Sequence, residues 1–177
     1  VHADNANPSL THNITHHNIG SVFDLNRSVG VLDISNNLFH HNQGGSVRLQ
    51  NQAQANIYHN TFATADPIAV ELNYTSSATF SNNIVTHCVF ESIYKDGTST
   101  ISGTNNLFFW NNSNPNPLTN PLILNPQYID EALENYQLQR GSPAVNAGVD
   151  LGVLDDLLLV RRPIGAAPDM GAYEQKL

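Results

Sequence analysis

Three charged residues at near-equal spacing are the first candidates for chemistry in this sequence. Asp24, Arg48 and Glu71 lie 24 and 23 residues apart, and each directly precedes a leucine. If the leucines point into a core, alternation along a strand turns the charged side chains outward into one column. Two carboxylates can supply the acid and base of glycoside hydrolysis, and an arginine between them can bind a uronate. We predict these three as the catalytic residues if the chain is an enzyme, and a surface charge ladder is the favoured interpretation.

Uncharged polar residues follow the same leucines and extend the candidate surface. Asn26, Gln50 and Asn73 each come one residue after a leucine, and Tyr94 takes the corresponding place in the next repeat. A charged column flanked by amides and a tyrosine would suit a sugar polymer, because these groups bond hydroxyls and contact sugar rings. We predict these four as substrate-binding residues.

Histidines form a second candidate group. One column contains His17, His41, His87 and Trp110, and beside it His16 aligns with His40. Neighbouring imidazoles could share a metal ion, and the aromatic rings could instead stack on sugars. No carboxylate or cysteine joins the column in register, so polar cladding at a corner is favoured and no metal ligand or cofactor is predicted. Calcium held by clustered carboxylates and carbonyls would leave no signature in this sequence.

A repeat of about 23 residues must position these groups. Its reference asparagines lie 24, 23, 23 and 23 residues apart, at Asn13, Asn37, Asn60, Asn83 and Asn106. An apolar column two residues later contains Phe39, Phe62, Val85 and Phe108, and another lies three residues earlier, at Leu10, Ile34, Ile57 and Phe80. Ile101 continues the earlier column, and Ile93 continues the leucine column, if the last repeat bulges by two residues.

Each period contains three short alternating runs, which is typical of strands, and residues 1–112 show no helical stripe. The sequence therefore predicts an all-β parallel solenoid of about five coils in residues 1–112. Residues 113–177 are predicted to form a C-terminal capping segment of the same domain. Asn37 is expected at a corner, in the left-handed conformation, with its amide bonded to the next coil's amide. The alternative is a β-sandwich with asparagine-rich turns.

Several short motifs resemble those of a known family. "FHHN" (39–42), "FFWN" (108–111) and "GGSV" (44–47) resemble units of large β-helical surface proteins. "GSPAVNAG" and the terminal "DMGAYE" resemble the closing segment of secreted bacterial proteins in the right-handed parallel β-helix, pectin-lyase-like superfamily. Asn146 replaces the usual Asp of that segment, and Met170 replaces Ile. The resemblance implies a right-handed β-helix and secretion, but no single activity, because the superfamily contains enzymes and adhesins.

Composition limits the partners. The net charge is −8 with only 7 Lys and Arg, which argues against nucleic acid and anionic membrane surfaces. No apolar run reaches the ~20 residues of a membrane helix, and the single Cys88 excludes an internal disulfide framework. A polysaccharide or other surface glycan is the expected partner.

The first residues, "VHADNANPSL", resemble the middle of a chain. We expect a C-terminal piece of a longer secreted protein, with upstream coils or self-association covering Leu10, Ile14 and Phe23.

Two function classes remain open. The first is an extracellular or cell-surface protein with a structural, adhesive or carbohydrate-binding role. The second is a polysaccharide lyase or glycoside hydrolase acting on an acidic or neutral glycan at the Asp24–Arg48–Glu71 face. An enzyme should have a groove walled by loops around that face. Most turns are short, and the only irregular insertion is expected in 94–104, which favours the first class.

Overall fold

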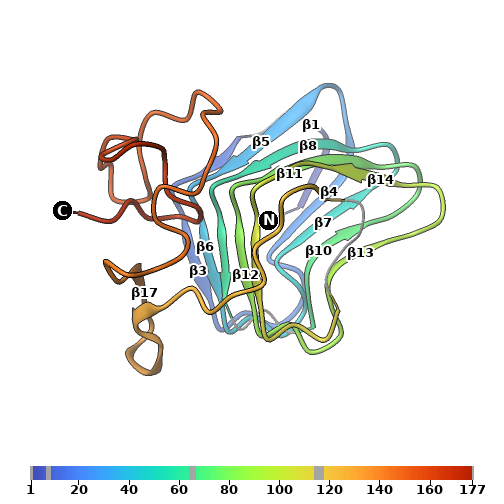
Figure 1. Ribbon diagram of the computed structural model, residues 1–177. Coiled ribbons are helices and arrows are strands. Elements are labelled where there is room, and N and C mark those ends of the chain that lie inside the picture. The colour runs from blue at the N-terminus through green and yellow to red at the C-terminus, as the bar shows by residue number, and fades with distance from the viewer. Residues whose placement is uncertain (1, 7–8, 64–66, 114–117, 177) are drawn as a thin grey trace.

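The computed structural model describes residues 2–6, 9–63, 67–113 and 118–176, and three parallel sheets dominate it (Figure 1). Sheet A contains β1 (His2–Ala6), β4 (Phe23–Ser28), β7 (Val47–Gln50), β10 (Ile68–Leu72) and β13 (Glu91–Lys95). Sheet B contains β2 (Leu10–Thr11), β5 (Val31–Ser35), β8 (Gln54–Tyr58), β11 (Ser77–Ser81) and β14 (Thr100–Ser102). Sheet C contains β3 (Ile14–His16), β6 (Leu38–His40), β9 (Thr61–Ala63), β12 (Ile84–Thr86) and β15 (Leu107–Phe109).

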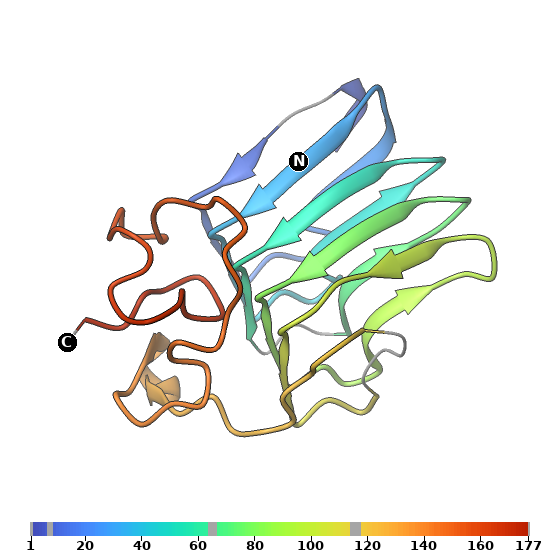
Figure 2. The ribbon, with the colours of Figure 1, turned by 45° about the horizontal axis from the view of Figure 1, so that its top comes forward.

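The chain visits sheets A, B and C in turn and passes each sheet five times. It therefore completes four full turns between the first and the last strand of a sheet, as the stacked coils in Figure 2 show. Each strand pairs in parallel with its counterpart one coil away, for example β8 with β5 and β11. These pairings confirm the predicted all-β parallel solenoid, because a fixed repeat keeps successive coils in register.

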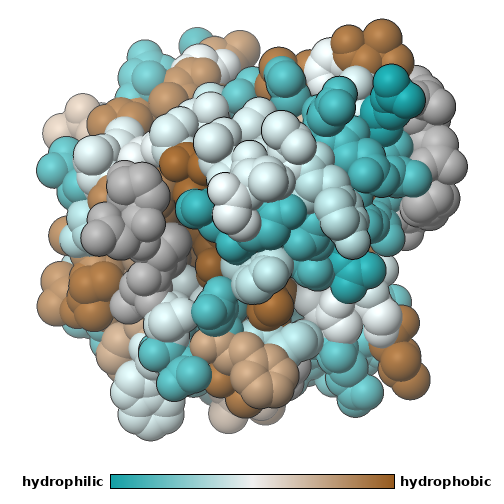
Figure 3. Space-filling view, turned by 90° about the vertical axis from the view of Figure 1, so that its right-hand side faces the viewer, coloured by the Kyte–Doolittle hydropathy of each residue, from teal (hydrophilic) through white to brown (hydrophobic). Residues whose placement is uncertain are grey.

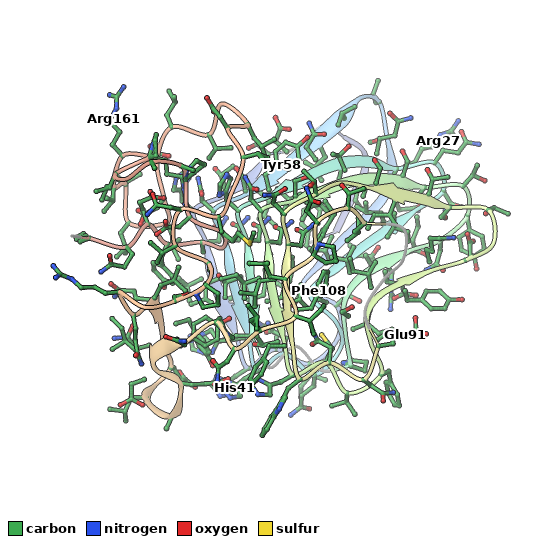
Figure 4. The ribbon with its side chains drawn as sticks, viewed as in Figure 1. Arg27, His41, Tyr58, Glu91, Phe108 and Arg161 are labelled. Atoms are coloured by element: carbon green, nitrogen blue, oxygen red, sulfur yellow. The ribbon has the colours of Figure 1, made fainter. Side chains whose placement is uncertain are left out.

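The predicted aromatic column fills the interior. The rings of Phe39 and Phe62 stack 5.0 Å apart, and Val85 and Phe108 follow in register on β12 and β15. All four side chains are fully buried, and Figure 4 shows Phe108 inside the ring of sheets. The prediction that these residues form the core stack is confirmed.

The predicted asparagine ladder lies at the corner between sheets B and C. The backbone N–H and the side-chain Nδ2 of Asn37, Asn60 and Asn83 each donate to Oδ1 of the next asparagine, at 2.9–3.2 Å. Asn106 ends the series. The same Nδ2 groups donate to backbone carbonyls, such as that of Ile34 from Asn60. The ladder thus satisfies corner backbone groups that no strand pairing can reach.

The conformational part of that prediction was wrong. The left-handed residue at this corner is the one before each ladder asparagine, with φ of 56° at Asn36, 53° at His59 and 57° at Asn82. An asparagine is needed at the ladder position because its side chain supplies both the Nδ2 donor and the Oδ1 acceptor of the ladder. Asparagine and histidine at the preceding position fit the enrichment of such residues at positive φ.

The last repeat has no two-residue bulge, and the expectations that depended on one were wrong. Ile101 pairs with Ala78, and Gly103 takes the place one coil from Phe80, where a Cβ would lie 1.9 Å from the Phe80 carbonyl oxygen. Only glycine allows that close backbone approach.

Ile93 pairs with Val70, and Tyr94 pairs with Glu71. Tyr94 therefore lies in the charged column and not in the amide column. The stretch 94–104 is not an insertion, because Thr100 pairs with Ser77 at the usual spacing.

The C-terminal segment, residues 118–176, begins against the fifth coil and then turns back along the molecule. Thr119 and Leu122 bridge to Thr104 and Leu107 in parallel. A hairpin of β16 (Tyr128–Asp130), the 3₁₀ helix η1 (Glu131–Leu133) and β17 (Asn135–Leu138) follows, and the remaining loops lie beside sheet C (Figures 1 and 2).

A second hydrophobic cluster lies between sheet C and this segment. Leu38, Ile84 and Leu107 contribute from the outer face of sheet C, and Tyr136 and Met170 contribute from the segment. Every residue of β6, β9 and β12 is buried, whereas β7 and β8 alternate between buried and more exposed residues. Sheet C is thus covered on both faces.

Close backbone approach anchors the segment there. Gly171, at φ +87°, lies so near sheet C that a Cβ would meet Thr61 Oγ1 at 2.8 Å. The Thr61 hydroxyl instead accepts from the Ala172 N–H at 2.9 Å, and Gly171 N–H donates to the Asn82 carbonyl at 2.7 Å.

Within the part of the chain that the structure describes, no helix has the length and apolarity needed to cross a membrane.

Candidate functional site

The predicted charged column forms on the outer face of sheet A. Asp24 is in register with Arg48, and Arg48 with Glu71. Arg48 Nε donates to Glu71 Oε2 at 2.8 Å, and Arg48 NH1 lies 3.8 Å from Asp24 Oδ2. One guanidinium therefore bridges two carboxylates from coils on either side of its own.

The predicted amide residues lie beside this column, and two of them bond its carboxylates. Gln50 donates to Asp24 at 2.8 Å, and Asn73 donates to Glu71 at 2.7 Å. Asn26 accepts from Asn51. The face is thus a band of polar groups already bonded to one another, and a ligand would have to exchange some of these contacts.

Sheet B carries a hollowed polar face that the sequence did not indicate. Two cavities of about 240 and 380 Å³ lie on it, and both are lined by Asn56. Residues of the first cavity come from four coils, at Val31, Gln54, Ala55, Asn56, Ser77, Ala78, Thr79, Thr100 and Ser102. We call the two cavities together the sheet-B groove.

The C-terminal segment walls one end of this groove. Leu151, Val153 and Asp155 line the larger cavity opposite the strand residues. His12 Nε2 lies 3.0 Å from Asp155 Oδ1 and fixes the wall to the corner between sheets B and C. A loop-walled groove therefore lies on sheet B.

Hydrogen bonds order the polar groups inside the groove. The Tyr58 hydroxyl donates to Asn56 Oδ1 at 3.2 Å, and Asn56 Nδ2 donates to Asp33 Oδ1 at 2.9 Å. Burial raises the pKa of Tyr58, so its hydroxyl remains protonated and available as a donor at neutral pH. Figure 4 shows Tyr58 on the side of sheet B that faces the C-terminal loops.

The side of the molecule where β13 joins β14 is mostly hydrophilic or intermediate, with scattered apolar residues (Figure 3). The polar character of the coils thus extends to this side, as expected for a chain with few charges and many amides.

The histidine column lies at the corner that follows sheet C, and it faces outward. His17, His41, His87 and Trp110 all have left-handed backbones, with φ between 52° and 61°. Trp110 is 76% exposed. Rings from adjacent coils stack, with centroids 5.1 Å apart for His17 and His41 and 4.9 Å apart for His16 and His40. Thr64, which takes the place between His41 and His87 in the repeat, lies outside the described residues.

Carboxylates approach this column from the C-terminal segment. Glu134 Oε1 lies 3.4 Å from His41 Nδ1 and 3.6 Å from His17 Nε2, and Glu131 Oε1 lies 3.0 Å from His87 Nδ1. Burial lowers the pKa of His40 to about 4, although the nearby Glu134 opposes that shift. His40 is therefore neutral at pH 7, with one ring nitrogen free of a proton.

Glu131 and Glu134 were not predicted from the sequence, because the predicted columns join only residues that the 23-residue repeat relates. A signal was present: β6, β9, β12 and β15 read LFH, TFA, IVT and LFF, with little alternation between apolar and polar residues. Strands without alternation are buried on both faces. The outer face of sheet C therefore had to be covered by another segment, and the residues after 112 are the part of the chain that the repeat does not use.

The comparisons with known proteins agree with the solenoid. Residues 1–119 match the model of a family described as "Right handed beta helix region". A search of curated proteins found no match to the chain.

Proposed function

The chain belongs to the right-handed β-helix family, and from that premise we propose that it is an extracellular β-helix protein that binds a polysaccharide in the sheet-B groove. The observation that carries this proposal is that the two cavities share Asn56 and together extend along several stacked coils.

The shape of the groove supports an extended ligand. Successive coils present equivalent positions about 4.8 Å apart, so a polymer meets the same set of polar groups repeatedly. The strand residues that line the first cavity include Gln54, Asn56, Ser77 and Thr79, all of which can donate and accept hydrogen bonds. Repeated weak contacts along a chain suit a glycan better than a compact metabolite.

The charge of the groove favours a neutral or amino-bearing glycan. Asp33 and Asp155 line the larger cavity, and no lysine or arginine does. Together with the net charge of −8, these carboxylates would repel a polyuronate. The proposed ligand is therefore a neutral polysaccharide or one with amino sugars.

The extracellular location is part of the proposal. It is supported by the resemblance of 141–148 and 169–174 to the closing segment of secreted bacterial β-helix proteins.

A glycan array followed by calorimetry with the best polysaccharide tests the proposal. Asn56→Ala and Tyr58→Phe remove donors inside the groove, and we expect each to weaken binding about tenfold. Asn73→Ala and Tyr94→Phe make matched changes on sheet A and should leave the affinity unchanged. Binding lost only in the sheet A variants would place the ligand on sheet A, and no binding to any glycan would favour a purely structural role.

A second candidate function is polysaccharide cleavage at the Asp24–Arg48–Glu71 column. One observation favours it: Arg48 bridges both carboxylates, so the two acids are closer than their backbones two coils apart, about 10 Å. Glycoside hydrolases hold their carboxyl groups roughly 5–9.5 Å apart. A polysaccharide-cleavage screen tests it, and cleavage abolished by Glu71→Gln would replace the binding proposal.

A further inference from the structure

The histidine corner, defined as His16, His17, His40, His41 and Glu134, has the composition of a metal site. Each imidazole offers one unprotonated nitrogen when neutral, and Glu134 offers a carboxylate oxygen. The ligand atoms of His17, His41 and Glu134 all lie within 4.8 Å of one another, as do those of His16, His40 and Glu134. Glu134 therefore belongs to two overlapping triads.

The distances between these atoms match those between ligands of a single ion. With bonds of about 2.0–2.1 Å, ligand atoms on a tetrahedral ion lie about 3.3–3.4 Å apart. Glu134 Oε1 lies 3.4 Å from His41 Nδ1, 3.6 Å from His17 Nε2 and 3.9 Å from His40 Nδ1. His40 Nδ1 and His41 Nδ1 share a hydrogen bond at 3.1 Å, which an ion bound by His41 would replace. The three distances to Glu134 suit an ion between the groups and are too long for direct hydrogen bonds to the carboxylate.

The pair His87 and Glu131, which lies along the same corner of the coils, differs from the histidine corner in its geometry. His87 has Trp110 one coil away in place of a second histidine, and its Nδ1 lies 3.0 Å from Glu131 Oε1, though not in hydrogen-bond alignment. A single imidazole is thus at contact distance from its glutamate. At the histidine corner, where imidazoles stack in pairs, Glu134 Oε1 lies 3.4–3.9 Å from three imidazoles.

The fold holds the ligands in place before any ion binds. His17 and His41 have fixed left-handed backbones, and the next residues, Asn18 and Asn42, bond each other at 3.0 Å. Glu134 also has a left-handed backbone, with φ 58°, and its N–H closes η1 on the Glu131 carbonyl. Tyr136 packs on His40 with ring centroids 5.2 Å apart. Such preorganisation lowers the entropy cost of binding.

Ligand chemistry and access select the ion. Imidazoles with one carboxylate suit Zn²⁺, Ni²⁺ or Cu²⁺, whereas Ca²⁺ and Mg²⁺ prefer oxygen ligands. The side chains of His17 and Glu134 are 58% and 40% exposed, so an ion can enter and keep a water ligand. We propose that His17, His41 and Glu134, with His16 and His40 beside them, bind a divalent transition-metal ion, Zn²⁺ foremost.

The proposed ion would join two parts of the chain. The histidines belong to the coils, and Glu134 belongs to the hairpin of the C-terminal segment. Binding would therefore stabilise the docking of that segment on sheet C, because an ion that binds only the docked state shifts the equilibrium toward it.

Calorimetric titration of the untagged full chain with ZnCl₂ at pH 7.5 tests the site. His41→Asn and Glu134→Gln remove ligands, and His87→Asn and Glu131→Gln are the matched controls on the same edge. Asparagine tolerates the left-handed backbone at both histidine positions. We expect one saturable Zn²⁺ site in the wild type and in both controls, and at least a tenfold loss of affinity in the two ligand variants.

A thermal melt supplies a second readout. Zn²⁺ should raise the melting temperature of the wild type and of Glu131→Gln, but not that of Glu134→Gln, and Ca²⁺ should raise none of them. Equal Zn²⁺ affinity in all four variants, or no saturable binding below about 100 µM, would overturn the proposal. Circular dichroism confirms that each variant is folded, and if His41→Asn is not, Glu134→Gln decides alone.

Discussion

The coils and the C-terminal segment satisfy their buried polar groups in different ways. In the coils, uncharged amides bond identical amides one repeat away, as Asn60 does with Asn83. In the C-terminal segment, charged side chains bond an irregular backbone. Arg162, with its side chain fully buried, donates to Glu174 at 2.7 Å and to the carbonyls of Asp169 and Gly171.

The difference follows from repetition. Each coil presents the same geometry to the next, so one short side chain per corner suffices and no charge needs to be desolvated. The C-terminal segment has little regular structure beyond one hairpin and a 3₁₀ turn, and its loop carbonyls point in different directions. A guanidinium with five donors can reach several of them at once. Buried charges then require partners of opposite sign, which Glu174 supplies.

Removing the buried cation should have the largest effect on stability. Arg162→Met leaves Glu174 buried without its partner, and Asp156 and Asp169 also lie nearby. We expect a loss of roughly 3–5 kcal/mol, because an unpaired buried charge is costly. A denaturant melt measures the loss, and limited proteolysis should show the C-terminal segment released first. A loss below about 1 kcal/mol would mean that the charges are not what holds this segment.

Truncating the coil core should have a comparable or slightly smaller effect. Phe62 is fully buried, and its ring stacks on Phe39 of the same column and on Phe80 of sheet B. Phe62→Ala should cost roughly 3–5 kcal/mol if the coils cannot collapse into the cavity. In contrast to Arg162→Met, cleavage in a proteolysis assay should then appear in the coils as well as in the C-terminal segment.

Breaking the amide ladder should cost less. Asn60→Ala removes donors to Asn83 and to the Ile34 carbonyl, and the acceptor for Asn37. We expect a loss of about 2–3 kcal/mol, since each buried group left without a partner costs roughly 1–3 kcal/mol, and Asn83 Oδ1 keeps the Asn60 backbone N–H as a donor. Chemical denaturation checks this value. No measurable loss would show that the ladder is a consequence of stacking and does not stabilise it.

The pH dependence of stability should come mainly from a buried histidine at the junction of the two regions. Burial, and then the nearby Arg162, lowers the pKa of His59 to about 3, and its ring bonds Asn82 and the Asp169 carbonyl. The unfolded state takes up a proton below about pH 6.5, but the folded state does not until about pH 3. Stability should therefore fall as the pH falls through this window.

Two other groups change how steeply the free energy of unfolding depends on pH. His40, whose pKa is lowered to about 4, acts in the same direction as His59. Burial raises the pKa of Asp169 to about 6, so this carboxylate takes up its proton at a higher pH in the folded state than in the unfolded state. Between about pH 6 and 4 this uptake stabilises the folded state and opposes the effect of the histidines. The free energy of unfolding of His59→Gln, measured between pH 7 and 5, should fall less steeply than that of the wild type. An unchanged slope would contradict the assignment.

The smallest effect is expected from the partly exposed ion pairs of sheet A. Arg48→Gln breaks contacts to Glu71 and Asp24 at the surface. The expected loss is below about 1 kcal/mol and should decrease with added salt. A loss as large as that of Arg162→Met would show that the contribution of an ion pair to stability in this protein does not depend on its burial.

The sequence by itself determined the coils. The 23-residue period, the ladder at Asn37, Asn60 and Asn83 and the stack at Phe39 and Phe62 are properties of near neighbours in a repeat. Each such residue contacts its own equivalent one period away, so the spacing alone predicts the contact. The errors at Ile93 and Ile101 arose from assuming a bulge where the register continues unchanged.

Only the tertiary structure decided where the C-terminal segment lies and which groups it brings to the coils. Glu134 is 93 residues from His41 in the chain, and Asp155 lines a groove with Tyr58. No repeat relates these residues, because the path of a non-periodic segment is set by the surface that it covers and by buried charges that must find partners. The lack of alternation in sheet C indicates that a cover is needed, but shape and charge together determine which side chains meet there.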